Sequence, residues 1–138
     1  MKKFEEDDIQ RIINWNKKEA SRRKESFGVK IDLLQEIIEK VNQFSNMPNE
    51  EERILQQTSS LIGLIVFWQP FNNANKATAM SSAIHFLRSN GYELDLISEG
   101  VQDELLQILN DVMYLFEDES QKGVNMVSEF MKQQIRKQ

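Results

Sequence analysis

The 138-residue sequence contains no cysteine, one histidine, two prolines and five glycines. Without cysteine the chain can form neither disulfides nor a thiolate zinc site, and it has no thiol nucleophile. A single histidine also argues against a catalytic zinc site, which needs several side-chain ligands. So few glycines and prolines leave little room for the many tight turns of a β-sandwich or barrel. The composition therefore favours helices.

The sequence also lacks a long apolar run and an excess of basic residues. Its longest apolar segment, LIGLIVFW at 61–68, has eight residues, whereas a membrane-spanning helix needs about 20. The N-terminal MKKFEEDDIQ has four acidic residues and no apolar core, so we expect no secretory signal, no membrane association and a cytoplasmic location. The 17 basic and 22 acidic residues give a net charge of −5, which argues against nucleic acid as a partner.

A chain of this length is expected to form one domain, residues 1–138, of the all-α class. Apolar positions at helical spacing predict a bundle of about six helices around a central apolar helix, with no convincing strand. Residues 1–30 are expected to form a helix and a loop, and residues 120–138 the C-terminal helix. Only YELDLI at 92–97 is a candidate for a short extended segment. The helices are expected at about 5–20, 31–44, 50–68, 73–90, 99–116 and 123–136.

One short segment, FWQPFNNANKATAM at 67–80, has three asparagines within four positions between two segments that are predicted to be buried. Pro70 is expected to end one helix and the next to begin near Asn73, where unpaired first-turn N–H groups favour an anion. In this interpretation Asn73 caps the new helix, Asn75 fixes the turn through its side chain, and Lys76 adds positive charge. The alternative is that these are ordinary cap and turn residues that bind only water.

Residues 69–79, QPFNNANKATA, resemble the signature of the Fic/Doc (Fido) family. The Doc-like branch of that family has approximately H-x-F-x-[D/E]-[A/G]-N-K-R-T-A. Similar context follows in AIHFLRSNGYEL at 83–94, and weaker similarity precedes it in SFGVKIDLLQEII at 26–38, so the resemblance covers most of residues 5–116. It implies a Fic/Doc-like helical bundle in which the loop 69–77 binds a nucleotide.

Four positions of this loop match the signature. The resemblance implies that Phe71 anchors the loop in the core and that Ala74 is the small residue that lets phosphate approach the backbone. It also implies that Asn75 shapes the loop and that Lys76 contacts phosphate. These residues, with Asn73 and Ala77 at altered positions, are the nucleotide-binding candidates.

Three positions depart from the signature, and the resemblance assigns all three to chemistry. Gln69 stands at the position of the catalytic histidine, and an amide has no proton affinity near neutral pH with which to act as a base. Asn73 replaces an acidic residue and is a poorer ligand for Mg²⁺ than a carboxylate. Ala77 replaces an arginine and removes its bidentate contact with phosphate. We therefore expect impaired catalysis and no metal site, with ATP or another nucleotide as the implied ligand.

Three functions follow from the resemblance. The first is a degenerate domain that binds a nucleotide, a phosphate or a partner protein through the loop 69–77. The second is an active transferase that moves AMP or phosphate from ATP to a protein hydroxyl. The third is a plain helical interaction module of a toxin–antitoxin or mobile-element system, whose partner is a protein target or is antitoxin-like.

Two other features invite a functional interpretation. His85, the only histidine, lies 16 residues beyond Gln69, which is about 24 Å along a helix. We therefore expect a solvent-facing or hydrogen-bonded side chain rather than a substitute base. The basic run from Lys17 to Lys24 is typical of a helix C-terminus, and contact with a phosphate-bearing or acidic partner is the alternative.

Overall fold

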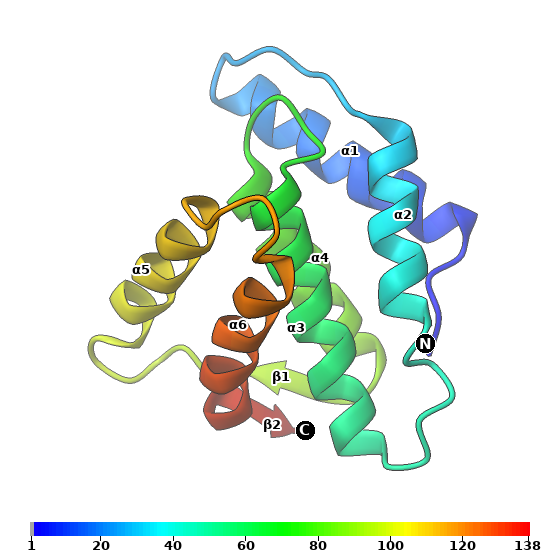
Figure 1. Ribbon diagram of the computed structural model, residues 1–138, viewed down its shortest axis with the longest axis vertical. Helices are drawn as coiled ribbons and strands as arrows, with labels where there is room; N and C mark the ends of the chain where they lie inside the picture. Colours follow the sequence, from blue (N-terminus) through cyan, green and yellow to red (C-terminus); the bar gives the residue numbers. More distant parts are fainter. Residues whose placement is uncertain (1) are drawn as a thin grey trace.

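The central element of the fold is a long helix, α3, around which four of the other helices pack (Figure 1). The computed structural model describes residues 2–138, which form a mostly helical single domain. Helices α2, α4, α5 and α6 all contact α3, whereas α1 packs against α4. In chain order the elements are α1 Glu6–Arg22, α2 Ile31–Asn42, α3 Glu50–Trp68, α4 Asn75–Ser89, β1 Tyr92–Leu94, α5 Val101–Met113, α6 Ser120–Gln134 and β2 Ile135–Lys137.

Helix α3 is capped at its start and is largely apolar in its second half. Asn49 begins it by accepting a hydrogen bond on Oδ1 from the Glu52 N–H at 2.9 Å, and three glutamates in its first turn face the positive end of the helix dipole. Twelve of its 19 residues are buried, which only a helix covered on several sides can achieve. The prediction of a central apolar helix over 50–68 is confirmed.

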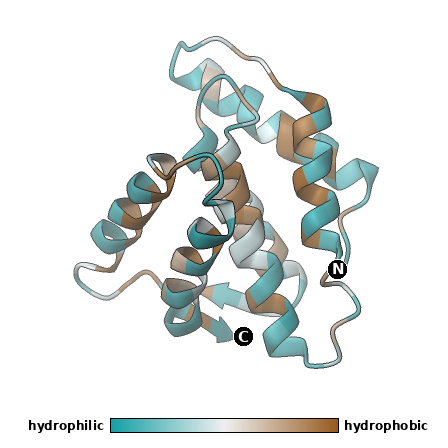
Figure 2. Cartoon of the chain, in the orientation of Figure 1, coloured by the Kyte–Doolittle hydropathy of each residue, from teal (hydrophilic) through white to brown (hydrophobic). Residues whose placement is uncertain are grey.

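Helices α3 and α6 are in close contact at a glycine. A Cβ atom on Gly63 would lie 3.0 Å from the Cα of Val124 in α6, too near for an ordinary side chain. The hydropathy of α3 rises from its hydrophilic first turn to its hydrophobic second half (Figure 2), and the buried residues of α6 are mostly hydrophobic. Packing against α6 therefore explains why the apolar helix carries a glycine in its middle.

The prediction of a fold without strands is wrong in one respect. Tyr92–Leu94 and Ile135–Lys137 form a two-stranded antiparallel sheet, β1 and β2, with Tyr92 opposite Lys137. The extended candidate at 92–97 is thus a strand in its first half, and the C-terminal helix ends at Gln134 rather than continuing through 120–138. The second strand exists because β1 offers it backbone partners, and such pairing across 40 residues leaves no local pattern in the sequence.

Two helix boundaries also differ from their expected positions, because left-handed residues stand at both. Gly100, with φ of 82°, lies directly before α5, which spans Val101–Met113 instead of 99–116. Ala74, with φ of 60°, precedes α4, which begins at Asn75 and not near Asn73. Across residues 2–138, none of the helices has both the length and the apolar character needed to span a bilayer.

Candidate functional site

The loop that joins α3 to α4 is bounded by two residues in the left-handed conformation. Gln69 has φ of 48° and donates its N–H to the Ile65 carbonyl, while Ala74 has φ of 60°. Neither is glycine, so each costs of the order of 1 kcal/mol. The chain thereby reverses direction within five residues and presents the first turn of α4.

Asn75 holds this loop through its buried side chain. Its Oδ1 accepts the Phe71 N–H at 3.1 Å, and its Nδ2 donates to the Phe71 carbonyl at 2.9 Å. Phe71 itself is only 3% exposed and belongs to the core. The prediction that Asn75 fixes the turn through its side chain is confirmed.

The prediction that Asn73 caps α4 is wrong. Ala74 occupies the cap position and has no side-chain hydrogen bond to offer. Asn73 instead contacts the segment between α1 and α2, where its Nδ2 donates to the Ser26 carbonyl at 3.0 Å. Asn73 is therefore a bridge between two loops and not a helix cap.

Residues 26–30, between α1 and α2, run alongside the loop. The Lys30 N–H donates to the Pro70 carbonyl at 2.7 Å, and the Asn72 N–H donates to the Gly28 carbonyl at 3.0 Å. An isolated antiparallel bridge pairs Val29 with Phe71. The loop is thus fixed on one side by Asn75 and on the other by backbone pairing with an earlier segment.

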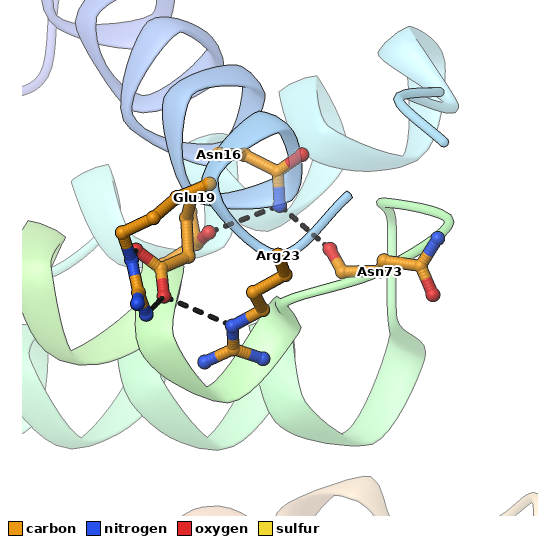
Figure 3. Close-up of polar contacts among 6 residues, drawn as sticks. Asn16, Glu19, Arg23 and Asn73 are labelled. Atoms are coloured by element: carbon orange, nitrogen blue, oxygen red, sulfur yellow. Dashed lines mark hydrogen bonds and ion pairs between the residues drawn. The ribbon is translucent and has the colours of Figure 1, made fainter. Parts of the chain in front are cut away.

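Helix α1 fixes the loop from a third direction through Asn16, which is buried. Asn16 Nδ2 donates to the Asn73 carbonyl at 2.7 Å and lies 3.0 Å from Thr78 Oγ1 on α4 (Figure 3). One helical turn later, Glu19 pairs with Arg22 and also accepts from Arg23 Nε at 2.9 Å. The hydrogen bonds from Arg22 and Arg23, together with the charges of both arginines, lower the pKa of Glu19 to about 2.

Five of the seven candidate residues line one hollow of about 200 Å³: Gln69, Asn73, Ala74, Asn75 and Lys76. The remaining lining residues are Arg23, Val66, Asn72 and Met113. Phe71 does not line this hollow and is buried in the core. Ala77 lines a separate hollow of about 210 Å³ that α1 and α4 form, beside Glu19 and Arg22.

The hollow is lined by two cationic side chains and by no acidic one. They are Arg23, which is ion-paired with Glu19, and Lys76, whose Nζ donates to Asn110 Oδ1 on α5. No acceptor for the first-turn N–H groups of α4, those of residues 75–77, is found in the part of the chain that the structure describes. The same part contains no group of three histidine or carboxylate side chains that could hold a metal ion. Cations together with helix N-terminal amides favour an anion such as phosphate.

Arg23, Val66 and Met113 are the lining residues that the loop sequence did not indicate, and of these Val66 is on α3, just before the loop. Arg23 belongs to the basic run from Lys17 to Lys24, for which contact with a phosphate-bearing partner was one of two interpretations. Met113 comes from α5, and only the tertiary fold brings it to the loop. The basic run could therefore have indicated Arg23 as a site residue, whereas no sequence pattern indicated Met113.

His85 lies well along α4, on the side that faces α1. Its Nε2 is 3.0 Å from Arg11 Nη1 and accepts that hydrogen bond, because a guanidinium can only donate. Its ring makes an edge contact with Trp15, with 5.2 Å between the centroids. The prediction of a hydrogen-bonded histidine is confirmed.

We expect His85 to make the protein less stable to unfolding as the pH is lowered from about 7.5 to about 5. Burial first, and then the Arg11 charge, lower the pKa of His85 below its ordinary 6.5. Its contribution to stability is therefore complete above pH 6.5 and is lost as the pH falls through the folded-state pKa. Urea unfolding of the wild type and of His85→Gln at both pH values measures this contribution. The variant should lose less stability than the wild type, and equal losses would contradict the expectation.

The fold and the loop together define a small helical domain with a cationic hollow at a helix N-terminus. Comparisons of the chain with models of protein families, with curated proteins and with solved structures find no match.

Proposed function

We propose that the chain is a degenerate Fic/Doc-like domain that binds the phosphate groups of a nucleotide such as ATP at the loop 69–77 without transferring any group. The observation that carries this proposal is the hollow itself. Arg23 and the first two residues of α4, Asn75 and Lys76, line it beside a loop that three separate elements hold in place. The resemblance of residues 69–79 to the family signature supports the same ligand.

The size of the hollow supports binding of phosphate groups rather than enclosure of a whole nucleotide. Its volume of about 200 Å³ is below the range of about 300–1,000 Å³ that is usual for pockets that enclose drug-sized ligands. A di- or triphosphate can approach Ala74, whose small side chain leaves the backbone amides accessible. The nucleoside would then lie outside the hollow and contribute less to affinity.

The residues at the chemistry positions support binding without catalysis. Gln69 lines the hollow but cannot take a proton from a hydroxyl, and a general base is worth typically about 10²–10⁴ in rate. The side-chain amide of Asn73 donates a hydrogen bond to the Ser26 carbonyl, so this side chain holds two loops together. Ala77 lies in the neighbouring hollow beside Glu19, where it offers no charge to a phosphate.

Calorimetric titration with ATP, and separately with pyrophosphate, tests the proposal. Arg23→Gln and Lys76→Gln should each weaken binding about 10- to 100-fold, because each removes a charge-assisted hydrogen bond. Arg22→Gln is the matched control. Arg22, like Arg23, donates a hydrogen bond to Glu19, but it does not line the hollow. Absence of binding at millimolar ATP, or an equal loss in the control, would overturn the proposal in favour of a plain interaction module.

Transfer of radiolabelled AMP or phosphate from ATP to lysate proteins tests the absence of catalysis. We expect no labelling by the wild type, with or without Mg²⁺. Labelling that disappears in Gln69→Ala and Lys76→Ala would establish the active transferase instead.

A further inference from the structure

The charges of this protein are unevenly distributed along the chain. Residues 89–121, which include β1 and α5, carry nine of the 22 acidic residues and none of the 17 basic ones. Residues 17–31, at the end of α1 and before α2, carry six basic and two acidic residues. The end of α5 with the turn after it and the end of α1 therefore carry charge of opposite sign.

The acidic region exposes two aromatic side chains at the end of α5. Tyr114 is 83% exposed and Phe116 is 78% exposed. We define the acidic face as Asp111, Tyr114, Phe116, Glu117 and Asp118, all of which are exposed. Aromatic side chains supply much of the binding energy at protein interfaces, and these two remain in water in the isolated chain.

The basic region also exposes apolar side chains. We define the basic face as Lys17, Lys18, Lys24, Phe27 and Ile31, all of which are exposed. Phe27 and Ile31 are 40% and 41% exposed, and Lys17 Nζ lies 5.7 Å from the centre of the Phe27 ring. The basic face thus combines positive charge with exposed apolar side chains. The acidic face likewise combines negative charge with exposed aromatic side chains.

The two faces border the same hollow. Arg23, next to Lys24, comes from the end of α1, and Met113, next to Tyr114, comes from the end of α5, and both line the hollow. A two-fold axis near the hollow would therefore bring the acidic face of one copy against the basic face of the other, twice. Such a contact is self-complementary and closes at two subunits.

We infer that the protein forms a two-fold homodimer in which the acidic face of each copy binds the basic face of its partner. The aromatic and aliphatic side chains supply the binding energy, and the opposite charges set the orientation and speed the encounter. Because exposed charges are screened by salt, the dimer weakens as ionic strength rises. The inference needs no bound ligand and does not rest on the proposed function.

Sedimentation equilibrium of the whole chain, up to about 200 µM and without nucleotide, tests the dimer, first in about 50 mM and then in about 500 mM salt. We expect a monomer–dimer equilibrium that shifts toward monomer at high salt. Tyr114→Ser with Phe116→Ser should raise the dissociation constant at least about tenfold. Ile97→Ser is the control, because Ile97 is 94% exposed but precedes α5 at its opposite end. A wild type that stays monomeric, or an equal loss in the control, would overturn the inference.

Charge reversal on each face distinguishes this dimer from any other self-association. Asp111→Lys with Asp118→Lys makes both faces positive, and Lys18→Glu with Lys24→Glu makes both negative, so each variant alone should be monomeric. Mixed in equal amounts they should form a heterodimer, since both face-to-face contacts are again between opposite charges. Circular dichroism verifies that both variants are folded. A folded pair that fails to associate on mixing would refute the arrangement.

Discussion

Replacement of Gln57 by leucine is expected to lower the free energy of unfolding by about 3 kcal/mol. Gln57 is fully buried on α3, where its Oε1 accepts from Arg53 Nη1 at 2.8 Å and its Nε2 donates to the Lys2 carbonyl at 2.7 Å. Arg53 is only 2% exposed, and no carboxylate pairs with it within residues 2–138. Within the same residues, leucine would leave this buried guanidinium with Asn90 Oδ1, 3.2 Å away, as its remaining acceptor.

A double-mutant cycle measured by urea unfolding tests the dependence of Arg53 on Gln57. Arg53→Met in the Gln57→Leu background removes the buried charge, so the double variant should be more stable than Gln57→Leu alone. Gln56→Leu is the control, because Gln56 makes only an exposed contact of 3.4 Å with Glu52. If the losses of the two single variants simply add in the double variant, Gln57 does not stabilise the arginine.

The helices of this protein could be predicted because each carries its own periodic signal. The apolar positions of α3 mark a helix that is covered on several sides, and the structure buries twelve of its residues. The apolar positions that define one face of a helix also drive the burial of that face, so the local pattern correctly predicts both the helix and its burial.

The elements that escaped prediction depend on partners far away in the sequence. β2, Ile135–Lys137, pairs with Tyr92–Leu94, and nothing in its three residues requires a strand. The start of α4 is set by Ala74, which adopts the left-handed conformation. Glycine is the usual residue at such a position, and the sequence has alanine there, so the sequence did not indicate this helix start. Alanine is tolerated there because the surrounding loop is fixed by Asn16, Asn75 and residues 26–30.

Part of the candidate site could be predicted because most of its residues are close together in the sequence. Gln69 and residues 73–76 are contiguous or nearly so, and they line one hollow. Ala77 follows them directly in sequence but lies in the neighbouring hollow, because helix α4 begins at Asn75 and turns successive side chains in different directions. Arg23 and Met113 arrive from other helices, so only the tertiary structure could add them.

Replacement of Asn75 by alanine is expected to cost about 2 kcal/mol of unfolding free energy and to abolish measurable ATP binding at the hollow. The side chain makes two hydrogen bonds with the backbone of Phe71, and alanine would leave the Phe71 N–H and carbonyl buried without these partners. A loop released from Phe71 no longer holds Ala74 left-handed, so the first-turn amides of α4 lose the arrangement that the proposed ligand requires. Urea unfolding measures the first effect and calorimetry with ATP the second.

Asn72→Ala separates loss of this bracing from a general effect of removing an asparagine. Asn72 is exposed and lines the same hollow. Its side chain lies against Gly28, and its backbone N–H, which donates to the Gly28 carbonyl, is retained by alanine. We therefore expect a change below about 0.5 kcal/mol for this surface substitution, with ATP binding preserved. Comparable losses in both variants would contradict the role of Asn75, whereas a stable Asn75→Ala protein that still binds ATP would show that residues 26–30 and Asn16 hold the loop without it.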